Sequence, residues 1–241
     1  VGFPGNINDR GPTAGLIGFG VLAAFFSPGV MYATPRLGGL QLSLGAYDPT
    51  PIPGTWEQTR YPRPEGELTY DYERGSFKLH LFGNGAYQTL YNAALVEHET
   101  MLGAGYGGRV EVGPVHLGAS GHYGKGLGLA YALQGGAVSV GPAPANQLRT
   151  FDGYSVLGQL ALGRIDVNLG WGISRTYRLQ SDIDAGNISI LKRQWAASAV
   201  LVWHATQRLH VALDYLHGDA AWFLGESQKF DFISTGVTAI W

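Results

Sequence analysis

Residues 165–174 read Ile-Asp-Val-Asn-Leu-Gly-Trp-Gly-Ile-Ser, and apolar side chains alternate there with polar side chains or glycine at every step. Successive residues of a β-strand point to opposite faces of a sheet, so this stretch predicts a strand with one apolar face and one polar face. The same alternation recurs in residues 40–45, 77–81, 115–120 and 209–215. The sequence therefore predicts an all-β protein.

The composition agrees with this fold class and excludes several functions. Only 14% of the 241 residues are charged, whereas the chain has 37 glycines, 10 Phe, 13 Tyr and 6 Trp. The longest apolar run, residues 15–26, is far shorter than the roughly 20 residues that a membrane-spanning helix needs. The net charge of −2 provides no basic surface for nucleic acid. No cysteine is present, so we expect neither disulfides nor thiol chemistry.

Eleven strands are expected, and the connections between them alternate between short and long. The expected strands are residues 29–35, 40–48, 64–73, 76–88, 99–112, 115–124, 150–163, 165–177, 189–204, 209–221 and 229–241. The short turns are residues 36–39, 74–75, 113–114, 163–164 and 205–208, and the long loops are residues 49–63, 89–98, 125–149, 178–188 and 222–228. Short turns at one end and long loops at the other are typical of a transmembrane up-and-down β-barrel.

Aromatic residues are expected to mark both ends of this barrel. Tyr72, Phe77, Trp203 and Trp241 fall beside short turns or the chain end, and Tyr47, Tyr123, Tyr154, Tyr177 and Phe230 fall beside long loops. Amphipathic rings favour the headgroup level of a bilayer, although strands are also enriched in aromatics for other reasons. A soluble ligand-binding barrel would alternate in the opposite sense, with apolar side chains inside. The long strands and the two aromatic rims favour apolar side chains facing lipid.

Two stretches resemble general bacterial outer-membrane porins. Residues 29–47 read Gly-Val-Met-Tyr-Ala-Thr-Pro-Arg-Leu-Gly-Gly-Leu-Gln-Leu-Ser-Leu-Gly-Ala-Tyr, which is similar to a strand after the third extracellular loop that turns and returns as the next strand. Residues 230–241 are similar to the C-terminal signal strand of that family, with Ile233, Thr235, Val237 and Ala239 on one face. That signal usually ends in Phe, whereas this chain ends in Trp241.

The resemblance implies a sixteen-stranded, homotrimeric channel in the bacterial outer membrane, with no cofactor. Such a channel lets small hydrophilic solutes and ions diffuse passively, and it contacts outer-membrane lipid and lipopolysaccharide. The eleven expected strands, in residues 29–241, would be the sixth to the sixteenth, with the first five absent from the sequence. Residues 1–28 would be the third loop, which constricts the pore. A smaller barrel of ten or twelve strands, with part of residues 1–28 as a strand, is the alternative.

Candidate pore-lining residues follow from the resemblance and from the alternation. In the family, acidic residues of the third loop face basic residues of the barrel wall, and the loop here offers Asp9 beside Arg10. A charge facing lipid at mid-depth costs about 2–4 kcal/mol, so charged side chains of the strands should face inward. The wall candidates are Glu65, Glu67, Asp71, Lys78, His80, Arg109, Glu111, Asp166, His210 and Asp214. With Asp9 as the only acid in the loop, we expect narrowing mainly by bulk.

No catalytic or metal-binding constellation is expected. Residues 103–108 have the G-x-G-x-x-G spacing of dinucleotide-binding loops, but they continue into a strand rather than opening a helix. The seven histidines have no metal-ligand spacing. Ser120 and His122 share one face and would begin the site of an outer-membrane hydrolase, which is the enzymatic alternative. A substrate-specific channel is the closer alternative, because loop and lumen detail decide between it and a general channel.

Overall fold

A computed structural model describes residues 16, 19–20, 23–24, 27–49, 56–58, 61–92, 97–126, 131–132, 148–184, 191–223 and 225–239. These residues form one large antiparallel sheet, in which eleven strands follow one another in the order of the chain. They are β2 (Gly29–Ala33), β3 (Leu40–Tyr47), β5 (Arg63–Arg74), β6 (Phe77–Asn92), β7 (Glu97–Val112), β8 (Val115–Lys125), β10 (Thr150–Leu162), β11 (Ile165–Thr176), β12 (Leu191–His204), β13 (Leu209–Trp222) and β14 (Ser227–Ala239). The prediction of eleven up-and-down strands is confirmed, and each strand overlaps its expected range.

Four smaller elements were not expected from the sequence. β4 (Trp56–Gln58) pairs with β6, which extends to Asn92 and so shortens the expected loop before β7. β1 (Ala23–Ala24) and β9 (Tyr131–Ala132) form a separate two-stranded sheet, and α1 (Gln180–Asp184) follows β11. The described residues contain no helix with the length and apolarity needed to cross a membrane.

The short turns owe their tightness to glycine. Two residues connect β5 to β6, β7 to β8 and β10 to β11, and in each turn the first residue is glycine with a positive φ: 61° at Gly75, 57° at Gly113 and 66° at Gly163. A positive φ at the first turn position matches the right-handed twist of the flanking strands. These hairpins therefore fix the register of long strands at one end of the sheet.

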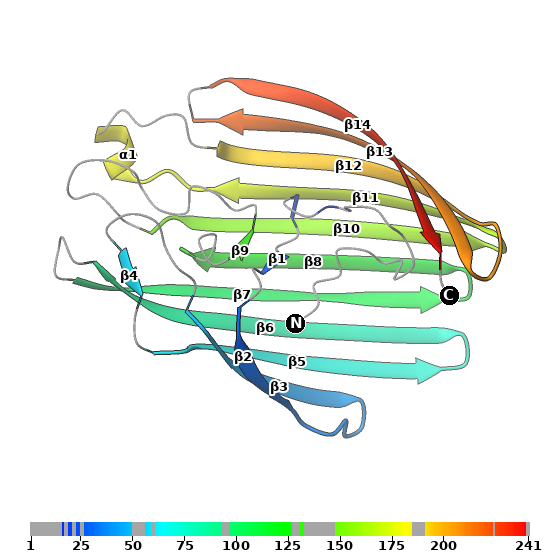
Figure 1. The fold of residues 1–241 in the computed structure, drawn as a ribbon, viewed down its shortest axis with the longest axis horizontal. Helices are drawn as coiled ribbons and strands as arrows, with labels where there is room; N and C mark the ends of the chain where they lie inside the picture. Colours follow the sequence, from blue (N-terminus) through cyan, green and yellow to red (C-terminus); the bar gives the residue numbers. More distant parts are fainter. Residues whose placement is uncertain are drawn as a thin grey trace.

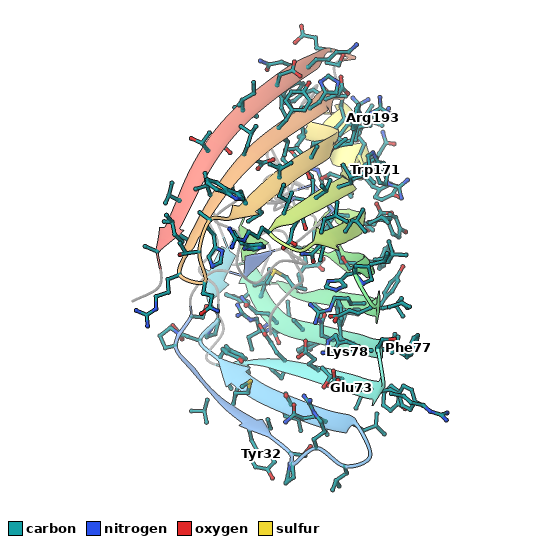
Figure 2. The ribbon with its side chains drawn as sticks, turned by 90° about the vertical axis from the view of Figure 1, so that its right-hand side faces the viewer. Tyr32, Glu73, Phe77, Lys78, Trp171 and Arg193 are labelled. Atoms are coloured by element: carbon teal, nitrogen blue, oxygen red, sulfur yellow. The ribbon has the colours of Figure 1, made fainter. Side chains whose placement is uncertain are left out.

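The sheet is strongly curved, with β14 at one edge and β2 at the other (Figures 1 and 2). β2 and β14 do not pair with each other within the described residues. Figure 2 shows Phe77 and Trp171 on the convex side, with Lys78 turned to the other face. Within the strands, the exposed large apolar side chains lie at convex positions except for Met31 and Phe232, which are on the edge strands.

The concave face, in contrast, holds most of the buried polar side chains. His122, Ser155, Gln159, Asp166, Ser174, His210 and Asp214 are all buried there. The alternation is thus reversed relative to a soluble barrel, whose apolar side chains point inward.

Candidate functional site: the concave face

The structure places all ten wall candidates on the concave face. Register partners connect them across neighbouring strands: Lys78 lies opposite Glu111, and His80 lies opposite both Asp71 and Arg109. The same alternation places Glu65, Glu67, Asp166, His210 and Asp214 on this face. Asp9 and Arg10 lie outside the described residues.

β5 contributes a column of carboxylates to this wall. Glu65 pairs with Arg63 at 2.8 Å, and Asp71 contacts both Arg36 at 3.1 Å and His80 at 2.7 Å. Glu67 is different, because its contact among the described residues is the amide of Asn84 at 3.5 Å rather than a cation. The column therefore has its least compensated negative charge at Glu67.

The remaining candidates of β6 and β7 form local ion pairs. Lys78 lies 3.6 Å from Glu73 of β5, and Arg109 lies 3.0 Å from Glu111. Such exposed or half-exposed pairs add little stability in water. Their main consequence is a wall with both signs of charge side by side.

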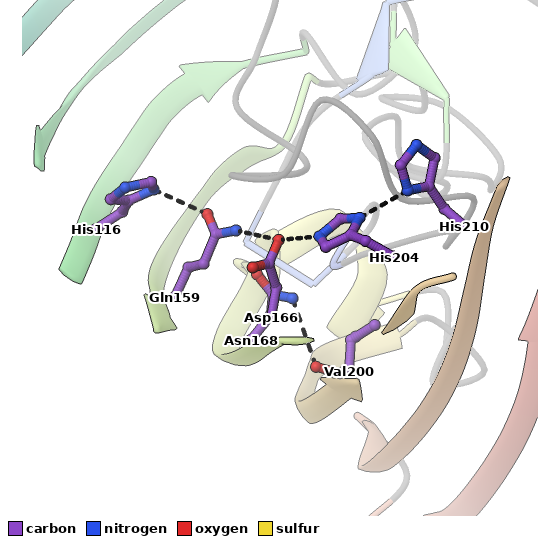
Figure 3. Close-up of polar contacts among 7 residues, drawn as sticks. All are labelled: His116, Gln159, Asp166, Asn168, Val200, His204 and His210. Carbon is purple, nitrogen blue, oxygen red and sulfur yellow. Dashed lines mark hydrogen bonds and ion pairs between the residues drawn. The ribbon is translucent and has the colours of Figure 1, made fainter. Parts of the chain in front are cut away.

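A continuous polar chain crosses five strands near the short-turn end (Figure 3). His116 Nδ1 lies 3.0 Å from Gln159 Oε1, and Gln159 Nε2 donates to Asp166 Oδ2 at 3.1 Å. Asp166 Oδ2 is 2.9 Å from His204 Nε2, and His204 Nδ1 is 2.6 Å from His210 Nδ1. An imidazole can donate from one ring nitrogen and accept at the other, which lets His204 connect Asp166 to His210.

Only Asp166 and His210 of this chain were among the sequence candidates. His116, Gln159 and His204 were not among them. His204 and His210 flank the short turn at residues 205–208 and are register partners. That placement beside a short turn is the signal that could have indicated the pair.

Leu16 and Phe19 supply a small apolar contact on the concave face. Leu16 is fully buried against Ala196 of β12 and Leu216 of β13, and Phe19 lies 5.7 Å from Phe230 between ring centroids. The backbone N–H of Gly20 donates to Ser174 Oγ at 2.9 Å. The described part of residues 1–28 therefore includes a segment held against the inner wall.

Glycine at position 172 makes this contact possible. A Cβ on Gly172 would overlap the backbone carbonyl of Phe19, and that atom cannot move without moving the segment. At neighbouring Gly170, a Cβ would lie only 3.1 Å from Leu16 Cδ1. The inner wall of β11 is therefore shaped to fit this segment.

The aromatic rims are partly different from the expectation. Tyr72, Tyr123, Tyr154, Tyr177 and Trp203 are exposed at convex positions, whereas Trp241 lies outside the described residues. Tyr47 and Phe230 were expected at the long-loop rim but occupy concave positions, because they share strand parity with inward-facing neighbours. Tyr47 lies under the guanidinium of Arg63, and Phe230 packs on Phe19.

The two residues of the hydrolase alternative, Ser120 and His122, make separate contacts on the concave face. Ser120 Oγ is hydrogen-bonded to Ser155 Oγ at 2.7 Å, and His122 packs beside Phe151, where its buried Nε2 has no hydrogen-bond partner among the described residues. Residues 103–108, with their nucleotide-loop spacing, lie inside β7. Among the described residues, no group of three or more His, Asp or Glu side chains could hold a metal ion.

Comparisons with known proteins agree with this architecture. No family model matches the sequence, and no curated protein matches it. Among solved structures, the chain is similar to the outer-membrane channel DcaP of Acinetobacter baumannii, with a TM-score of 0.76 and 17% identity over 89% of this chain and 62% of that one. It is also similar to an anion-selective porin from Comamonas acidovorans, with a TM-score of 0.55 and 12% identity over 87% of this chain and 58% of that one.

The chain thus spans about three fifths of the length of each of these two proteins. At identities this low, the similarity concerns the fold alone. In this chain that fold is a curved antiparallel sheet with an apolar convex face and a polar concave face. The chain has the fold of the outer-membrane porin barrels.

Proposed function

We propose that this chain forms the greater part of the wall of an outer-membrane porin, through which small hydrophilic solutes and ions diffuse passively. The observation that carries the proposal is the reversed alternation, with exposed apolar side chains on the convex face and charged side chains on the concave face. Exposing this much apolar surface to water would be unfavourable, whereas lipid would cover it at no such cost. The concave face would then line an aqueous pore.

Closure of the barrel is part of the same proposal. Within the described residues, β2 and β14 leave two sheet edges unpaired, and a bilayer does not tolerate unpaired backbone groups. We infer that strands outside the described residues complete the wall, and a sixteen-stranded barrel would require five of them beside the eleven described here. The exposed apolar side chains of Met31 and Phe232 on the edge strands would then be covered by those neighbours. The homotrimer remains a further proposal.

The proposal assigns no enzymatic step and no cofactor to the chain. Leu16 and Phe19, which are held against the wall of β11 to β13, would narrow the pore there. The carboxylate of Glu67 would favour cations modestly, since its partner among the described residues is a neutral amide. Selectivity in such pores follows from width and from the charges on the wall.

Planar-bilayer recording of the native full-length protein that carries this chain tests the proposal. Stepwise increases in conductance are expected, and a correctly folded protein that leaves the bilayer silent would contradict the pore. Block of the current by one solute class but not by others of equal size would instead indicate a substrate-specific channel.

A further inference from the structure

Two arginines meet on the convex face at the long-loop end of the sheet. Arg175 of β11 and Arg193 of β12 are direct register partners, and both occupy convex positions. Figure 2 shows Arg193 projecting from the convex side on the same part of the sheet as Trp171. Like charges directly opposite each other on neighbouring strands are unfavourable. An anion bound between the two guanidinium groups would relieve this repulsion.

The nearby carboxylates of Asp152 and Asp219 do not neutralise the two arginines at the surface. Asp152 accepts hydrogen bonds from Arg175 at 2.7 and 2.8 Å, but its side chain is only 6% exposed, compared with 41% for Arg175. Asp219 is 9% exposed and lies 4.0 Å from Arg193, which is 52% exposed. The acids are therefore buried beneath the guanidinium groups, and the surface that reaches solvent is basic.

Other charged groups share this end of the convex face. Lys229 of β14 is exposed opposite Asp219. Asp231 is an exposed carboxylate, but its Oδ1 is already hydrogen-bonded to Tyr215 at 2.6 Å and contacts His217 at 2.9 Å. Arg175 uses two of its five N–H donors on Asp152, so further donors remain for a ligand.

The position of the two arginines identifies the kind of anion. On β11, the convex positions from Ile165 to Ile173 are all apolar, and Arg175 is the next convex residue. At about 3.3 Å per residue, this apolar stretch is about 26 Å long, and at the strand tilt of about 40° found in membrane barrels it would span about 20 Å of the roughly 25 Å apolar band. On β12, Trp195 ends the equivalent stretch and Arg193 follows it. Both guanidinium groups thus lie where the apolar band ends.

We propose that Arg175 and Arg193 form a binding site for the phosphate of an outer-leaflet lipid whose acyl chains cover the apolar band below. Planar guanidinium groups bind phosphate through paired, charge-assisted hydrogen bonds. Tyr154, whose ring lies 5.5 Å from the Arg175 guanidinium carbon, and Tyr177, which donates to Asp152 at 2.9 Å, hold Arg175 in place. The inference rests on the proposed contact between the convex face and lipid.

Native mass spectrometry of the full-length protein in neutral detergent, titrated with lipid A, tests the site. Arg193→Gln should weaken lipid A binding about tenfold, as expected for loss of a charge-assisted contact, and it should leave the ion-channel conductance unchanged. Arg208→Gln removes an exposed cation at the opposite end of the sheet and is the matched control. Arg175→Lys keeps a cation beside Asp152 while removing the planar fork, and it should also weaken binding.

Two outcomes would overturn the site. Unchanged lipid A binding by Arg193→Gln, or an equal loss in Arg208→Gln, would show that the pair does not recognise the lipid. Displacement of lipid A by millimolar inorganic phosphate would assign the site to a free anion rather than to a lipid headgroup. A wild-type protein that shows no channel conductance would count against the pore proposal. The lipid A titration, in contrast, tests only the site formed by Arg175 and Arg193.

Discussion

Adjacent residues of β11 allow a sharp test of which face of the sheet meets lipid. Leu169 is 60% exposed at a convex position in the middle of the apolar stretch, and Asn168 faces the concave side, where its amide lies 3.5 Å from the carbonyl of Val200. An arginine facing lipid at the bilayer midplane costs about 2–4 kcal/mol. Leu169→Arg should therefore destabilise the folded protein by about 3 kcal/mol, or roughly a hundredfold in the folding equilibrium.

Reversible denaturant unfolding from phospholipid vesicles measures this difference. Asn168→Arg should cost less than about 1 kcal/mol, because an inward-facing guanidinium remains in water. Ile165→Arg, on the same convex face but at the end of the strand, controls for depth and should also cost no more than about 1 kcal/mol. If Asn168→Arg were as costly as Leu169→Arg, or costlier, the assignment of the convex face to lipid would be refuted.

Three further changes test the concave face. Leu16→Ala removes a fully buried side chain whose truncation typically costs about 2–5 kcal/mol, so the contact of Leu16 and Phe19 with the wall should weaken and the single-channel conductance should rise; an unchanged conductance would argue against a narrowing role. Glu67→Gln should shift the reversal potential in a salt gradient toward lower cation preference, and an unaltered potential would show that this carboxylate does not influence permeation. Asp166→Leu removes the oxygen that contacts both Gln159 Nε2 and His204 Nε2, so thermal unfolding should show a loss of about 1–3 kcal/mol, whereas equal stability would mean that the polar chain is not holding the strands together.

The strands and their two faces were predictable because alternation is a local property of the sequence. The faces of Leu169 and Asn168 follow from the alternating pattern of their immediate neighbours. A two-residue turn that begins with glycine, as at Gly163, marks where the chain reverses direction. Phe230 shows the limit of a simpler rule. Its position near a loop suggested the outer rim, but Ile233 is on the convex face, and strand parity therefore places Phe230 on the concave face.

The contacts of the concave face were not predictable, because they join residues far apart in the chain. The hydrogen bond from Gly20 to Ser174 spans 154 residues, and neither residue has a distinctive local pattern. The need for glycine at position 172 appears only once Phe19 is placed above it. The polar chain from His116 to His210 likewise depends on the register of five strands.

The chain contains no cysteine, so single introduced thiols give the most direct test of the water-filled concave face. Cysteine at the concave positions Asn84 and Asn168 should react with a charged, membrane-impermeant thiosulfonate during bilayer recording, and each reaction should lower the current. Cysteine at the convex positions Leu81 and Leu169 should leave the current unchanged under the same reagent. Current loss at Leu81 and Leu169, with none at Asn84 and Asn168, would contradict the account.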